Sequence, residues 1–198
     1  LQQLLKRFDI PVYTKQGTWR EIQDKLVVPK NQLIELTKGS LTLGNLIVEP
    51  FAVSHDAADP IGINVFSGND KATVVTDTGI ISDDILHRLD DSTLLVLEAN
   101  YDPHMLRFGP YQPFLKQRVA SDEGHLSNEM AAQALLMMKR PDFMQVILAH
   151  RSENNNNAVL VTQTIGKMLV DGGVRIGPEM KLQHGQPNEI VSMKSVKR

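Results

Sequence analysis

The sequence predicts an α/β fold, in which helices cover a sheet that contains parallel strands. Short apolar and β-branched runs alternate along the chain with segments whose apolar residues recur at helical spacing. Several of these runs end in a histidine or an aspartate, the position at which α/β proteins commonly place a site. A chain of 198 residues suits one well-buried domain, so we expect residues 1–198 to form a single domain.

The amino-terminal part begins with apolar residues at positions 1, 4, 5 and 8, which is the spacing of one helix face. A short strand at 10–13 and a helix at about 18–26 are expected next, and this helix, strand, helix order favours the α/β class. Strands are then expected at 32–36 and 46–54. Because the first helical pattern begins at Leu1 without an N-cap residue, we expect an amino-terminal portion to be missing.

The rest of the chain continues the alternation of strands and helices. The segment 67–70 suits a hairpin turn, and Ser82 and Ser127 are placed to cap helices. The predicted elements are strands at 62–66, 72–76, 93–97 and 143–149, helices at 82–89, 127–138 and 158–169, and two short helices within 103–119. Beyond Gly177 the Pro, Gln and Gly content predicts a loose tail, with a last edge strand at 190–196.

The charge pattern bears on nucleic-acid partners. The formal net charge of −2 gives no global basic field, so contacts with nucleic acid would come from local patches. Arg107, Lys116 and Arg118, with Tyr111 and Phe114 between them, would suit a nucleic-acid backbone. The alternative is a solvated helix face.

The absence of cysteine and the hydropathy pattern exclude several kinds of site and of protein. The absence of cysteine excludes disulfides and thiolate ligands, and leaves any metal to His, Asp and Glu. No apolar run approaches the ~20 residues of a membrane span, and no signal-peptide pattern is present. We therefore expect a cytoplasmic protein without a membrane partner.

The strongest candidate site combines three strand ends. His55, Asp77 and His150 each follow an apolar run. If the three side chains converge at one edge of the sheet, their imidazole and carboxylate donors suit a divalent transition metal. The alternative is that each is an ordinary polar residue at the end of a strand. Asp56 and Asp59 are candidates to orient His55 through its second ring nitrogen, with loop capping as the alternative for both.

Five motifs occur in a specific order. They are Ser-His-Asp-Ala-Ala-Asp-Pro at 54–60, Thr-Asp-Thr-Gly at 76–79, Glu-Ala-Asn-Tyr-Asp at 98–102, Gly-His-Leu-Ser-Asn at 124–128 and Leu-Ala-His-Arg-Ser at 148–152. This order resembles the later part of the metallo-β-lactamase superfamily, and within it the YycJ (WalJ, VicX) branch, from Leu1 to about Leu169. The resemblance implies the carboxyl-terminal portion of an αββα sandwich. It also implies one or two divalent ions, zinc or manganese, in the complete protein, with a metal-bound hydroxide as nucleophile.

The resemblance implies roles for individual residues as well. His55, Asp77 and His150 look like metal ligands, with Asp77 bridging two ions. His125 resembles a histidine near the scissile phosphate that acts as acid or oxyanion partner, and Glu98 resembles the acidic residue that supports its loop. The predicted catalytic residues are therefore His125, Asp77 and Glu98. The predicted substrate contacts are Asn128, Asn154 and Arg118.

One departure from the family pattern affects the functional prediction. The motif H-x-H-x-D-H does not occur in this sequence, and neither His87 nor His184 offers its paired spacing. The resemblance implies that the remaining ligands precede Leu1, or that the chain is inactive. For the complete protein it implies a metal-dependent phosphodiesterase that binds DNA, most concretely a double-stranded DNA exonuclease. The alternatives are hydrolysis of another ester or of an RNA phosphodiester, and an inactive fragment with a binding or regulatory role.

Overall fold

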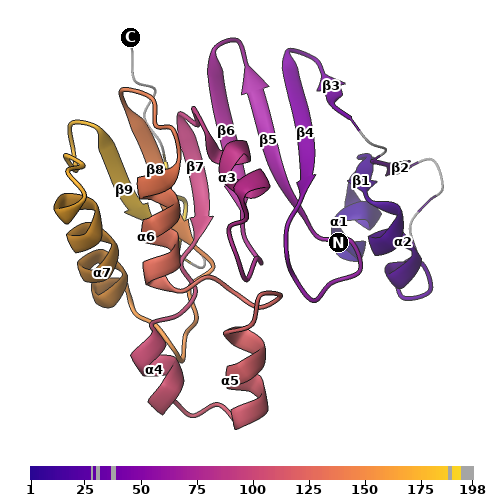
Figure 1. Ribbon diagram of the computed structural model, residues 1–198. Helices are drawn as coiled ribbons and strands as arrows, with labels where there is room; N and C mark the ends of the chain where they lie inside the picture. Colours follow the sequence, from indigo (N-terminus) through magenta and orange to yellow (C-terminus); the bar gives the residue numbers. More distant parts are fainter. Residues whose placement is uncertain (28, 30–31, 37–38, 187–188, 193–198) are drawn as a thin grey trace.

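The protein is centred on a seven-stranded sheet with the strand order β3-β4-β5-β6-β7-β8-β9 (Figure 1). It is known from a computed structural model that describes residues 1–27, 29, 32–36, 39–186 and 189–192. The strands are β3 (Leu41–Leu43), β4 (Leu46–Ala52), β5 (Ile61–Ser67), β6 (Asp70–Val75), β7 (Leu94–Glu98), β8 (Met144–Ala149) and β9 (Met180–His184). The sheet confirms the predicted α/β class.

Strand direction determines where the loops meet. From β3 to β6 neighbouring strands are antiparallel, and from β6 to β9 they are parallel. Because β4 and β6 are both antiparallel to β5, they run in the same direction as β7 and β8. The carboxyl ends of β4, β6, β7 and β8 therefore lie at the same edge of the sheet, the usual location of sites in α/β proteins.

Three helices cover one face of the sheet: α3 (Asp83–Leu89), α6 (Asn128–Met137) and α7 (Ala158–Asp171) (Figure 1). Side chains of Ser82 and Ser127 accept the backbone N–H of Ile85 and Met130, which confirms both predicted N-caps. The core between helices and sheet includes Val75, Ile85, Leu89, Leu95, Leu97, Leu135, Val146, Ile165 and Leu169.

The opposite face of the sheet is apolar and only partly covered. Ile63, Val74, Val96 and Ile147 are register partners across four adjacent strands, so their side chains share this face. Val74 is 39% exposed, and the other three are half-buried. One helical layer on one sheet is the arrangement expected for a portion of an αββα sandwich.

Two short helices, α4 (Pro103–Phe108) and α5 (Pro113–Val119), form a separate pair at the bottom of the sheet in Figure 1. They share a small core, in which Tyr101, Leu106 and Val119 are buried and Tyr111 and Leu115 pack against them. This pair adjoins the edge at which the strand carboxyl ends meet.

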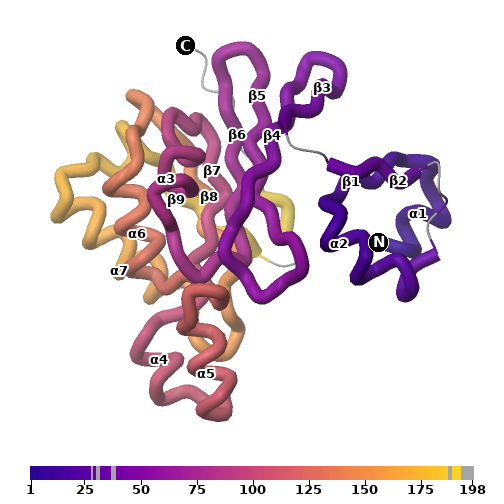
Figure 2. The backbone as a smooth tube through the Cα atoms, turned by 45° about the vertical axis from the view of Figure 1, so that its right-hand side comes forward, coloured from indigo at the N-terminus to yellow at the C-terminus, as the bar shows by residue number. Residues whose placement is uncertain are grey.

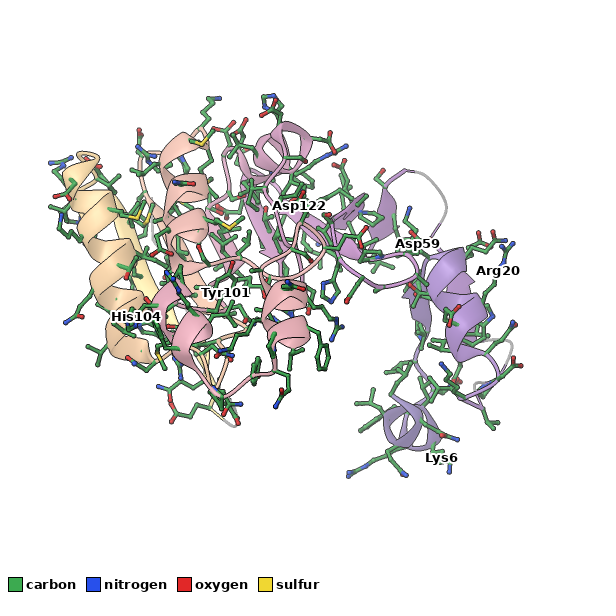
Figure 3. The ribbon with its side chains drawn as sticks, turned by 60° about the horizontal axis from the view of Figure 1, so that its bottom comes forward. Lys6, Arg20, Asp59, Tyr101, His104 and Asp122 are labelled. Carbon is green, nitrogen blue, oxygen red and sulfur yellow. The ribbon has the colours of Figure 1, made fainter. Side chains whose placement is uncertain are left out.

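The amino-terminal elements are α1 (Gln2–Arg7), β1 (Val12–Thr14), α2 (Gln16–Ile22) and β2 (Leu33–Glu35). The two strands pair in parallel in a sheet of their own, which lies to one side of the large sheet (Figure 2). Asp59 joins the two parts, because its carboxylate accepts Gly17 N at 3.2 Å and its carbonyl accepts Thr18 Oγ1 at 3.2 Å. Figure 3 shows Asp59 beside α2.

Two element predictions are corrected. Helix α2 begins at Gln16 and ends at Ile22, where 18–26 was expected. The tail contains a strand, β9, which pairs with β8 from Met144 opposite Met180 onward. No strand forms at 190–192. The rest of the predicted edge strand at 190–196 lies outside the described residues. Among the described helices, none is long and apolar enough to cross a membrane.

Candidate metal centre

The candidate centre lies on the loops that follow β4, β6, β7 and β8. Glu98 is the last residue of β7, Asp77 and His150 come within two residues of the ends of β6 and β8, and His55 follows β4. Gly79 N donates to Ser54 O at 2.8 Å, and Ser54 N donates to Thr78 Oγ1 at 3.3 Å. These bonds fix the His55 loop against the Asp77 loop.

Asp77 and His150 both have left-handed backbone conformations, with φ of 56° and 53°. Non-glycine residues adopt this region rarely, because the Cβ atom crowds the backbone. Such conformations persist where surrounding contacts enforce them, and they cluster at functional sites. For His150 the enforcing contact is a hydrogen bond of 2.8 Å from Asn100 Nδ2 to its carbonyl oxygen.

Three histidine rings at the centre contact a protein acceptor through the same nitrogen, Nδ1. His55 Nδ1 lies 3.0 Å from the carbonyl oxygen of Gly124, which can only accept a hydrogen bond. His125 Nδ1 and His150 Nδ1 lie 2.7 and 2.8 Å from Glu98 Oε1. Each ring therefore donates through Nδ1, which leaves Nε2 with its lone pair free. Metal-binding histidines are commonly held in this way.

The free nitrogens converge on Asp77. Its Oδ1 lies 3.7 Å from His55 Nε2 and 3.5 Å from His150 Nε2. These separations exceed those of ordinary hydrogen bonds. A tetrahedral ion about 2.1 Å from each donor would place its ligands about 3.4 Å apart. Asp77 Oδ1 therefore lies from His55 Nε2 and from His150 Nε2 at close to the spacing of two ligands of one ion.

His125 belongs to the same cluster. Ligand atoms of His55, Asp77 and His125 all lie within 4.8 Å of one another, as do those of Glu98, His125 and His150. The His125 ring centroid is 5.1 Å from both neighbouring histidine rings. Its Nε2 is therefore available either to a metal or to a substrate at the centre.

Glu98 is fully buried beneath the histidines and accepts from both His125 and His150. Burial disfavours its charged form, but the hydrogen bonds from the two rings outweigh burial, so the pKa of Glu98 lies below its ordinary value. The same bond raises the pKa of His150, against the effect of burial. The second oxygen of Glu98 accepts Thr78 N at 3.1 Å, which links the ends of β6 and β7.

The group that orients His55 is not one of the two carboxylates expected from the sequence. Gly124 O, and neither Asp56 nor Asp59, accepts from His55 Nδ1. Asp56 is paired with Arg118, whose Nε and Nη2 both donate to its carboxylate, the second at 3.1 Å. This ion pair lowers the pKa of Asp56. Arg118 therefore lies next to the centre, and Asp59 serves as the contact to α2 described above.

Asn128 and Asn154 are placed very differently from each other. Asn128 is fully buried, and it exchanges hydrogen bonds of 3.2 and 2.9 Å with Asn156. Asn154 is exposed, with Nδ2 3.5 Å from the hydroxyl of Tyr111. The position of Asn128 supports a structural role, because no surface of its side chain is open to a substrate in this structure.

Asn100 and Asn156, which were not singled out from the sequence, hold the His150 loop in place. Asn156 Nδ2 donates to the carbonyls of Ala99 and Asn100, each at 3.1 Å. Asn100 then donates to the carbonyl of His150. The sequence signal was present in the runs Glu98-Ala-Asn and 154–157, but nothing in it showed that the two runs meet.

Comparison with known proteins defines the class. The family described as "Beta-lactamase superfamily domain" matches residues 1–150. Together with the sheet and the histidine and aspartate cluster, this match shows that the chain belongs to the metallo-β-lactamase superfamily. Its curated relatives place it in the YycJ/WalJ branch of that superfamily. This fold implies the use of a divalent metal.

The relatives include the exodeoxyribonuclease YycJ of Bacillus anthracis, with 33% identity over 186 residues, and the exodeoxyribonuclease WalJ of Streptococcus pneumoniae, with 30% identity over 190 residues. Each comparison covers 93% of this chain and 70% of the relative. Among solved structures, the metallo-β-lactamase fold protein YhfI of Bacillus subtilis superposes with a TM-score of 0.60 at 14% identity. That comparison covers 87% of this chain and 61% of YhfI, and supports the fold alone.

Proposed function

We propose that the protein hydrolyses phosphodiester bonds at DNA ends with the help of a divalent ion, as a double-stranded DNA exonuclease. Superfamily membership and the names of the relatives support a metal-dependent hydrolase. The observation that carries the proposal is that acceptors hold Nδ1 of all three imidazoles, while Nε2 of His55 and of His150 lies 3.7 and 3.5 Å from Asp77 Oδ1. The names of the relatives support DNA as the substrate.

His55, Asp77 and His150 would hold the ion. When bound, a divalent ion, zinc or manganese, supplies an activated water and polarises a phosphoryl oxygen. Three protein ligands with one open position are typical of catalytic zinc sites. The motif H-x-H-x-D-H does not occur in this sequence, so these three residues would supply only part of the ligand set that the resemblance implies.

His125 is proposed as the acid that protonates the leaving oxygen. Its Nδ1 is held by Glu98, so a proton taken up by this ring would sit on Nε2 and could be transferred from there. The buried carboxylate of Glu98 fixes the direction of the His125 ring. Glu98 is therefore proposed to act through His125, and not on the substrate.

The decisive experiment measures metal-dependent release of nucleotides from an end-labelled DNA duplex by the complete protein. We expect release with manganese or zinc, loss with a chelator, and a decrease of at least about 100-fold for Asp77→Ala. Asp142→Ala is the matched control, because Asp142 is exposed on the loop before β8, at the opposite edge of the sheet.

A labelled RNA duplex and a small-molecule phosphodiester serve as parallel substrates. Preference for either over DNA would reassign the substrate and leave the metal chemistry in place. Undiminished DNA hydrolysis by Asp77→Ala would refute the proposed centre itself.

A further inference from the structure

The helix pair α4 and α5 carries two phenylalanines that the fold does not use. Phe108 is 67% exposed and Phe114 is 70% exposed, although Leu106 and Val119 of the same helices are buried. Exposing two large aromatic side chains to water has no structural benefit, and such surfaces commonly mark binding sites. We call the exposed Arg107, Phe108 and Phe114 of this pair, with the half-buried Lys116, the α4–α5 surface.

The charged side chains of this surface are all basic. Residues 103–121 contain Arg107, Lys116 and Arg118 and no aspartate or glutamate, in a chain whose formal net charge is −2. Lys116 Nζ donates to the carbonyl of Arg107 at 2.8 Å, which joins the two helices and brings their cations together. The Arg107 guanidinium carbon lies 5.4 Å from the Phe108 ring centroid. Aromatic faces interleaved with cations suit a polyanion with stackable bases.

The α4–α5 surface is anchored to the candidate centre at the far end of α5. Arg118 is paired with Asp56, the residue after His55. His125 N donates to Val119 O at 2.9 Å, so the His125 loop folds back onto the same end of the helix. Figure 3 shows the face of the molecule that contains this region, with Tyr101 and His104 near α4 and Asp122 above α5.

We infer that the α4–α5 surface binds the end of a DNA strand, with Phe108 and Phe114 stacking on exposed bases and Arg107 and Lys116 contacting phosphates. Inside a duplex both faces of each base are covered by neighbouring bases, so an aromatic side chain reaches a base face only at an end or in a single strand. The surface would therefore select ends for the neighbouring centre. This inference rests on the proposed function and specifies how its substrate is recognised.

A second copy of the chain is the competing occupant of this surface. In a two-fold dimer the same patch meets itself, so the cations of one patch would face those of the other. Juxtaposed like charges oppose such pairing. The charge therefore favours DNA.

The test measures binding of the complete protein to a fluorescent linear duplex in the presence of EDTA, which prevents cleavage. Linear and covalently closed circular DNA of the same sequence serve as competitors. We expect the linear form to compete better, and the double variant Phe108→Ala with Phe114→Ala to bind the linear duplex roughly tenfold more weakly or worse. Replacement of both residues by Trp should retain binding. Val170→Ala is the matched control, an exposed apolar residue on α7.

The outcomes separate the inference from the proposed function. If the complete protein degrades duplex ends and the double Ala variant binds them as the wild type does, the inference is overturned and the exonuclease proposal stands. If the wild type neither binds nor degrades the duplex, both fail. If the double Ala variant converts a dimer into a monomer in sedimentation without weakening DNA binding, the surface is a self-association site and the inference is overturned.

Discussion

Glu98 illustrates how a single side chain organises the centre. Its Oε1 is within hydrogen-bond distance of two histidines, and its Oε2 accepts a backbone N–H from the turn after Asp77. A buried carboxylate is unfavourable unless it is fully hydrogen-bonded, so this arrangement stabilises the charge and orients both rings at once. Replacing Glu98 should therefore disturb metal binding, ring orientation and the pH dependence of stability together.

The pKa shifts predict how the metal-free protein responds to pH. The pKa of Glu98 is below its ordinary value of 4.5, so its stabilising contribution is present above 4.5 and is lost as pH falls through the lower folded value. The pKa of His150 is above 6.5, so its contribution is present below 6.5 and is lost as pH rises through the higher folded value. The pair contributes most between these limits.

We predict that Glu98→Gln makes the free energy of unfolding depend less on pH, at both the acidic and the alkaline end of the range. Urea unfolding from pH 3 to 9 in EDTA measures the profile, and the difference between wild type and variant should be largest between about pH 4.5 and 6.5. Glu153→Gln, at an exposed position, is the control. A difference that does not change with pH would contradict the assignment.

At the scale of elements, the loops around the centre depend on close backbone contact. A Cβ atom at Gly79 would lie 2.3 Å from the carbonyl oxygens of Ser121 and Asp122. From sequence this glycine indicates a tight turn, but the residue with positive φ in that turn is Asp77. Gly79 is instead required for the close approach of the 121–122 backbone to the β6 turn.

We predict opposite effects of alanine at two glycines. Gly79→Ala should destabilise the protein by about 1 to 3 kcal/mol, because backbone atoms must move. Gly166→Ala should stabilise it by about 0.5 to 1 kcal/mol, because Gly166 lies inside α7 and its nearest neighbour, Ile176 Cδ1, is 3.9 Å from the added carbon. Chemical unfolding measures both, and equal effects would contradict the structural account.

Some elements were predicted correctly from local signals. The hairpin at 67–70 and the caps at Ser82 and Ser127 depend on neighbouring residues, and the structure has all three. Strand β9 was missed because it is short and lies among polar residues, although Met180 and Leu182 alternate as a strand requires. Its stability comes from pairing with β8, a contact far away in sequence.

The candidate site likewise combines features that are readable from the sequence with features that are not. The donors His55, Asp77 and His150 were identifiable from strand ends and from the resemblance, because ligand types and motif order are written in the sequence. The acceptor for His55 was not, because it is the carbonyl of Gly124, and a backbone carbonyl leaves no mark on residue identity. Sequence reasoning therefore named the donors and Glu98, and missed the group that orients His55.

For the whole molecule, a bound ion should couple the loops that follow three strands, β4, β6 and β8. His55, Asp77 and His150 come from distant parts of the chain, so an ion held by all three exists only in the folded state. A ligand at 100 times its dissociation constant stabilises the folded state by about 2.7 kcal/mol.

We predict that saturating zinc or manganese raises the unfolding temperature by roughly 5 to 10 °C in a chain of this size. Asp77→Ala should remove this increase, and Asp142→Ala should keep it. Calorimetry without any substrate measures the effect, so the result does not depend on activity. An equal increase for Asp77→Ala and wild type would show that the ion binds elsewhere.

The left-handed conformations of Asp77 and His150 affect how this protein would respond to engineering. Programmes that select variants for thermostability favour glycine or asparagine where the backbone has this geometry, because either residue adopts it at lower cost. At His150 either residue would also remove the hydrogen bond to Glu98, so the gain in stability is expected at Asp77. There glycine would remove the carboxylate donor, and asparagine would leave only an amide oxygen. Thermostability without metal and turnover would therefore select different amino acids at Asp77.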